Sequence, residues 1–80
     1  MEDLSKLRQD IDRIDRQIVE LFEERMGVSR QVAEYKIATG KKVLDAERER
    51  QKLKALRGRA HGEFNQLGIQ ELFEQIMAIS

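Results

Sequence analysis

The chain has 80 residues, and its fifteen Lys and Arg residues balance fifteen Asp and Glu residues, which gives a formal net charge of zero. This balance argues against a broad cationic surface for DNA or RNA. The sequence has no cysteine and one histidine, which excludes disulfides, thiolate nucleophiles, cysteine-based zinc sites and histidine metal clusters. A domain this small without cross-links is expected to depend on an oligomeric partner.

The composition also predicts the fold class and the location of the protein. Proline is absent, aromatic residues are few, and long charged side chains fill the gaps between apolar positions. We therefore expect a single all-α domain of three helices over residues 1–80. The N-terminal residues lack the basic and apolar regions of a secretory signal, and no stretch is long enough for a membrane span. These features predict a cytoplasmic protein without a membrane partner.

The first predicted helix is long and runs from about Asp3 or Leu4 to near Thr39. Gly40 supplies the left-handed residue that often ends a helix. Residues spaced alternately three and four positions apart lie along one side of this helix. We call this row the long-helix stripe, and it consists of Leu4, Leu7, Ile11, Ile14, Ile18, Leu21, Arg25, Val28, Val32 and Tyr35.

The length of this helix predicts how the protein assembles. Roughly 35 residues span about 50 Å in a helix, whereas a compact domain of this size has a radius of gyration of only about 12 Å. The helix must therefore extend beyond its own globule and expose the long-helix stripe. We expect a homodimer in which two such helices pair, in antiparallel orientation and intertwined.

Arg25 interrupts the stripe, and its guanidinium needs either a protein carboxylate or an anionic ligand as a partner. Lys36 lies about three turns, or roughly 16 Å, further along the same face, so the two cations could hold one small anion. Arg8 lies roughly 25 Å from Arg25 along the helix. A two-fold axis near the middle of the helix would bring Arg8 of the partner subunit to the other two cations.

A second helix is predicted after Asp45, a good N-cap, and it should end between Gly58 and Gly62. Glu49 and the flanking Arg48 lie in its first turn. The helical period places Glu49 in the row that faces inward, which consists of Ala46, Glu49, Leu53, Leu56 and Ala60.

Two interpretations of Glu49 follow from its position. It could neutralise Arg25 or Lys36 in a structural ion pair, or it could belong to a binding site. Because the converging cations outnumber the inward carboxylates, the charges favour an anionic ligand. A third helix should begin between Glu63 and Gly68 and carry an apolar row to the chain end, which consists of Ile69, Leu72, Phe73, Ile76 and Met77.

The order and spacing of these residues resembles the all-helical bacterial chorismate mutases, most closely the mutase domains fused ahead of prephenate dehydratase. The resemblance covers essentially the whole chain. Three segments carry it: Leu7-Arg8-x-x-Ile11-Asp12-x-x-Asp15-x-x-Ile18-Val19-x-Leu21-Phe22-x-x-Arg25, Val32-Ala33-x-x-Lys36 and Val43-Leu44-Asp45-x-x-Arg48-Glu49. It implies an intertwined three-helix homodimer with two active sites, each of which receives an N-terminal arginine from the opposite chain.

The resemblance also implies an activity and a set of roles. The activity is the isomerisation of chorismate, a dicarboxylate, to prephenate in phenylalanine and tyrosine biosynthesis, with no cofactor and no metal. Arg8 of the partner subunit and Arg25 would bind the two carboxylates, and Arg48 would arrange that end of the pocket. Ser80 would lie near a substrate carboxylate.

The remaining roles concern the reacting part of the substrate. Lys36 would donate to the ether oxygen and a carboxylate, while Asp45 and Glu49 would address the ring hydroxyl; Lys36, Glu49 and Arg25 are the expected catalytic residues. The family also carries a glutamine one turn after the serine, beyond the last residue of this sequence. We therefore expect residues 1–80 to be a truncated or excised N-terminal domain of reduced activity.

Two other functions remain open at this point. An isochorismate-pyruvate lyase would share the fold, the cations and a closely related substrate. A non-catalytic dimerisation or ligand-sensing module would bind without turnover.

Overall fold

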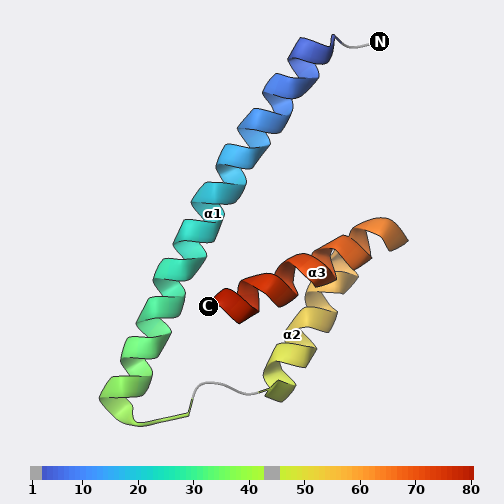
Figure 1. Ribbon diagram of the computed structural model, residues 1–80. Coiled ribbons are helices and arrows are strands. Elements are labelled where there is room, and N and C mark those ends of the chain that lie inside the picture. Colours follow the sequence, from blue (N-terminus) through green and yellow to red (C-terminus); the bar gives the residue numbers. More distant parts are fainter. Residues whose placement is uncertain (1–2, 43–45) are drawn as a thin grey trace.

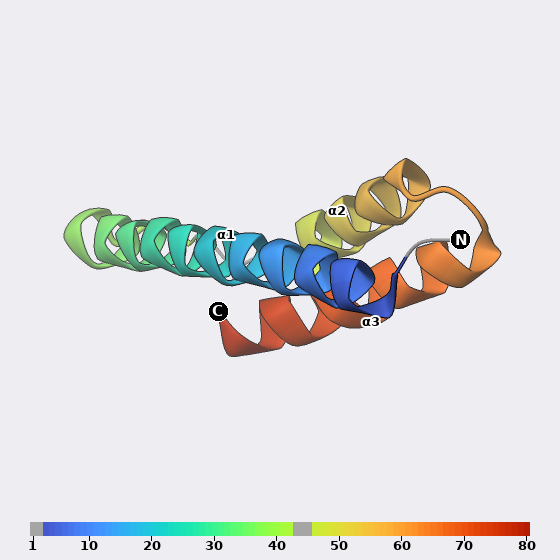
Figure 2. The ribbon, with the colours of Figure 1, turned by 90° about the horizontal axis from the view of Figure 1, so that it is seen from above.

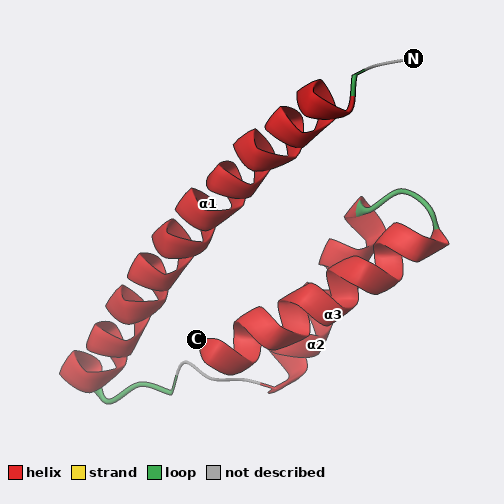
Figure 3. Cartoon of the chain, turned by 45° about the horizontal axis from the view of Figure 1, so that its top comes forward, coloured by secondary structure: helices red, strands yellow, loops and turns green. Residues whose placement is uncertain are grey.

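A computed structural model describes residues 3–42 and 46–80, and these residues form three helices (Figure 1). Helix α1 comprises Leu4–Thr39, α2 comprises Ala46–Arg59, and α3 comprises Glu63–Ile79. The described residues contain no strand (Figure 3), so the predicted all-α class of three helices is confirmed. Within these two ranges, no helix has the length and apolar character that crossing a membrane requires.

Both ends of α1 are capped, and the C-terminal cap at Gly40 is the one that the sequence predicts. The Asp3 side chain accepts a hydrogen bond of 3.3 Å from the backbone N–H of Ser5. At the other end Gly40 has φ 70° and ψ 4°, and its N–H donates to the Lys36 carbonyl over 2.8 Å. A left-handed glycine in this place satisfies a carbonyl that the helix itself leaves without a donor. Helix α1 therefore ends at the predicted residue.

The bounds of α2 and α3 also fall within the predicted intervals. The expected N-cap of α2, Asp45, lies outside the described residues. Helix α3 begins directly after Gly62, which has φ 89°. Gly68 lies inside α3 and neither begins nor breaks it.

Helices α2 and α3 pack against each other as a hairpin, and the C-terminal end of α3 approaches the middle of α1 (Figures 1 and 3). Leu53 and Leu56 of α2 are half-buried. So are four apolar residues of α3, which are Ile69, Phe73, Ile76 and Met77. Leu72, the fifth member of the predicted row, is 48% exposed in the single chain.

The protein is elongated, because α1 extends well beyond the hairpin (Figure 2). The principal extents are 57 × 26 × 16 Å and the Cα radius of gyration is 16.4 Å. No described residue is fully buried, and the apolar members of the long-helix stripe are 42–64% exposed. The single chain therefore leaves the stripe uncovered, as the length of the helix predicts.

Candidate functional site

Arg25 and Ser80, two predicted site residues from opposite parts of the sequence, are in direct contact. Arg25 Nη1 donates to Ser80 Oγ over 3.0 Å. The Ser80 hydroxyl in turn donates to the Ile76 carbonyl over 2.6 Å, and Met26 Sδ lies 4.0 Å from Ser80 Oγ. Arg25 is half-buried. The interruption of the stripe thus coincides with the point where the end of α3 meets α1.

The contact with Ser80 leaves most of the Arg25 guanidinium available. A guanidinium carries five N–H donors in a fixed plane, and this arrangement suits a carboxylate. Across residues 3–42 and 46–80, the ion pairs are Lys6 with Asp10 and Arg50 with Glu47. Arg25 is therefore not neutralised by a carboxylate of the described chain, and its remaining donors can serve an anion.

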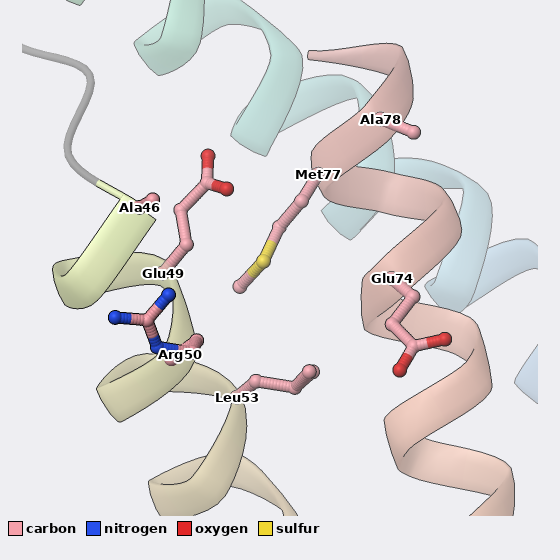
Figure 4. Close-up of a pocket in the computed structure, with 7 residues that line it drawn as sticks. All are labelled: Ala46, Glu49, Arg50, Leu53, Glu74, Met77 and Ala78. Carbon is pink, nitrogen blue, oxygen red and sulfur yellow. The ribbon is translucent and has the colours of Figure 1, made fainter.

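Glu49 lines a pocket of about 360 Å³ between the start of α2 and the end of α3 (Figure 4). Leu53 of α2 and Met77 of α3 give it apolar walls, and Glu74 adds a second carboxylate from α3. The complete lining consists of Ala46, Glu49, Arg50, Leu53, Glu74, Met77 and Ala78. The pocket thus combines apolar walls with the carboxylates of Glu49 and Glu74 and the guanidinium of Arg50.

The structural ion pair that would have explained Glu49 is not found in the described chain. Glu49 forms no ion pair with Arg25 or Lys36 among the residues that the structure describes. The single chain thus keeps these cations and this carboxylate apart. The binding-site interpretation of Glu49 stays a prediction, and the single chain is compatible with it.

The other predicted site residues lie further from the Arg25–Ser80 contact. Arg8 is exposed in the N-terminal part of α1, Lys36 is exposed in its last turn, and Arg48 is exposed on α2. In the described part of the chain, no hydrogen bond or ion pair joins these three side chains to Arg25, Ser80 or Glu49. Asp45 lies outside the described residues. One chain therefore brings together Arg25 and Ser80, and it leaves Arg8 remote.

Arg50, Glu74 and Ala78 line the pocket but are not among the residues predicted from the sequence. Glu74 comes one turn before Ala78, at the edge of the apolar row of α3, so the helical period could have placed both beside Met77. No cluster of three or more His, Asp or Glu residues that could hold a metal occurs in the described residues.

One comparison with known proteins bears on this geometry. A family model described as chorismate mutase type II matches residues 7–80. The match includes every predicted site residue from Arg8 to Ser80. A search of curated proteins found no match.

Proposed function

The chain belongs to the chorismate mutase type II family, and we propose that it catalyses the rearrangement of chorismate to prephenate in phenylalanine and tyrosine biosynthesis. The observation that carries this proposal is the Arg25–Ser80 contact, within a chain that matches the family over residues 7–80. It presents a guanidinium that no described carboxylate neutralises, at the junction of two helices. A dicarboxylate substrate fits such a group.

The chemistry suits a site built from cations. The rearrangement is a concerted pericyclic step, so it needs no nucleophile and no obligatory general acid. The protein must hold the folded conformer of the substrate and stabilise the negative charge that grows on the ether oxygen as its bond breaks. Fixed arginines do the first task because they bind carboxylates in a bidentate manner.

We assign the carboxylate end of the substrate to arginines. Arg25 binds one carboxylate, with Ser80 beside it, since the hydroxyl already contacts this guanidinium. Arg8 of the partner subunit binds the other carboxylate, and Arg48 arranges this end of the pocket.

We assign the reacting end to Lys36, Asp45 and Glu49. Lys36 donates to the ether oxygen, where an ammonium placed in advance meets the developing charge without reorganisation. Glu49 and Asp45 address the ring hydroxyl. The position of Glu49 on the wall of the α2–α3 pocket, beside Met77, supports this role.

The proposed site needs two chains, and the shape of the protein supports an intertwined homodimer. Antiparallel pairing of two α1 helices covers the exposed long-helix stripe and brings Arg8 to the opposite Arg25. We further propose that the chain acts as one mutase domain, similar to those fused ahead of prephenate dehydratase, and that it works in the cytoplasm.

The decisive experiment is to follow the absorbance of chorismate after adding the purified chain and to identify the product. Prephenate is the expected product. Release of pyruvate from isochorismate, with no prephenate from chorismate, would instead identify a lyase of the same fold. Saturable binding of chorismate without turnover would identify a ligand-sensing module.

A further inference from the structure

A chain of side-chain hydrogen bonds crosses from α2 to α3 and then follows α3 toward the pocket. Arg57 Nη1 donates to Gln70 Oε1 over 2.6 Å. Gln70 Nε2 donates to Glu74 Oε1 over 3.1 Å. Gln70 is half-buried between two exposed charged residues. The amide oxygen of Gln70 accepts from α2, and its amide nitrogen donates to a residue of α3. An apolar side chain of the same size can make neither bond.

The Arg57–Gln70 bond lies nearer the loop of the hairpin than the pocket does, whereas Glu74 at the end of this chain of hydrogen bonds lines the pocket. Near the loop, Gln66 Nε2 also donates to the Ala60 carbonyl over 3.3 Å. Around the pocket, the described residues show no side-chain hydrogen bond between α2 and α3. The facing groups there include Leu53 and Met77, and apolar contacts have no directional preference. The polar contacts near the loop are therefore the directional contacts between the helices, and they restrict the angles that the apolar packing allows.

Glu49 and Ser80 lie at a distance from the Arg57–Gln70 bond. A small change of the angle between the helices at this bond therefore displaces both residues by a larger amount. Glu49 lies about two turns, or roughly 12 Å, before Arg57 along α2. A rotation of about 5° at the Arg57–Gln70 bond would move Glu49 by about 1 Å, and a misplacement of this size can lower a rate by on the order of 100-fold. Ser80 lies roughly 15 Å beyond Gln70 along α3 and is moved in the same way.

We infer that Gln70 is a positioning residue, which fixes the angle between α2 and α3 through Arg57 and Glu74 and thereby the placement of Glu49 relative to Ser80. The inference rests on the proposed function for its catalytic consequence. Its structural content, the angle of the hairpin, stands on the hydrogen bonds alone.

The kinetic test compares Gln70→Met with Arg59→Met, which removes an exposed cation from α2, the helix that carries Arg57. We expect kcat of Gln70→Met to fall about 10-fold with KM changed less than about two-fold, and Arg59→Met to match the parent. The double variant Arg57→Met/Gln70→Met should lose no more than Gln70→Met alone, because both changes break one contact. Additive losses, or a kcat that follows the melting temperature in all variants, would overturn the inference.

A rescue experiment separates positioning from simple packing. Gln70→Glu keeps the acceptor for Arg57 but places a carboxylate beside Glu74, so kcat should fall. Gln70→Glu/Glu74→Gln restores both bonds with the second one reversed, because the new amide at position 74 donates to the new carboxylate at position 70. We expect kcat to recover to within about two-fold of Glu74→Gln alone. Failure to recover counts against the inference.

A distance measurement keeps the test independent of activity. The sequence has no cysteine, so spin labels can be placed uniquely at Ala46→Cys and Ala78→Cys, which line the pocket from opposite helices. With the labelled chain diluted into unlabelled chain, Gln70→Met should shift or broaden the distance distribution, while Arg59→Met should not. An unchanged distribution overturns the inference. If the parent chain does not convert chorismate, the proposed function fails, and the distances alone decide whether Gln70 sets the angle.

Discussion

Arg25 and Ser80 lie 55 positions apart in the sequence, yet only 3.0 Å separates Arg25 Nη1 from Ser80 Oγ. This hydrogen bond ties the end of α3 to the middle of α1. The guanidinium is held by a neutral hydroxyl and not by a carboxylate, so its charge is retained at the junction. The contact between the two helices therefore leaves Arg25 a cation that no described carboxylate neutralises, as the proposed binding of a substrate carboxylate requires.

Lys36→Ala should abolish most of the activity without disturbing the fold. We expect kcat to fall about 100- to 1000-fold, the loss typical of a donor that stabilises developing charge on oxygen. Lys36 is exposed, so its removal should change the free energy of unfolding by less than about 0.5 kcal/mol. Turnover of chorismate and urea unfolding measure the two effects. Lys41→Ala, a change at another exposed lysine nearby, is the matched control, and equal kcat values in the two variants would remove Lys36 from the mechanism.

Mixing two inactive variants tests whether the site is shared between chains. Arg8→Ala and Arg25→Ala should each be nearly inactive as homodimers. In a mixed dimer, one site combines the intact Arg25 of one chain with the intact Arg8 of the other, and the second site lacks both. Random exchange of chains should therefore restore about a quarter of the parent activity. Absence of recovery, after mass spectrometry has confirmed mixed dimers, would show that each site is built from a single chain.

The helices of this protein can be predicted from local sequence patterns, whereas the contacts between the helices cannot. The three helices and the left-handed Gly40 follow from local patterns, and Arg25 stands out because it breaks a regular stripe. The Arg57–Gln70 bond and the exposure of Leu72 could not be predicted in the same way. They depend on the angle at which α2 crosses α3, and that angle depends on the apolar packing of both helix surfaces together with the polar contacts between them.

The same distinction applies to the candidate site. Spacing along α1 places Lys36 on the face of Arg25, because a single rigid helix fixes their relation. The approach of Ser80 to Arg25 depends on packing between helices, so the sequence pattern could indicate it only through the resemblance to a family. The second carboxylate of the pocket, Glu74, belongs to no motif and became apparent only from its neighbours in space.

A charge on the long-helix stripe should dissociate the proposed dimer. Ile18 is 54% exposed in the single chain, so Ile18→Asp costs little unless a second chain covers it. If the stripe is the dimer interface, an unpaired carboxylate is buried there at a cost of about 3 kcal/mol, which raises Kd at least about 100-fold. Sedimentation equilibrium measures this shift. Ile37→Asp is the control, since Ile37 is 83% exposed and lies outside the stripe, and equal masses for both variants would exclude this interface.

Two glycines of α1 should respond in opposite directions to the same substitution. Gly27 lies inside the helix, and a Cβ added there meets no atom within 4 Å. Gly27→Ala should therefore raise the free energy of unfolding by about 0.5–1 kcal/mol, because alanine loses less backbone entropy in a helix.

Gly40 also has open space around an added Cβ, but its φ of 70° disfavours any side chain. Gly40→Ala should lower the free energy of unfolding by about 1 kcal/mol. Urea unfolding at one fixed chain concentration compares the two variants, since the stability of a dimer depends on concentration. If Gly27→Ala lowers the free energy of unfolding instead, the added methyl group must meet a steric clash that is absent from the single chain. The cause would then be sought where the partner subunit lies against the middle of α1.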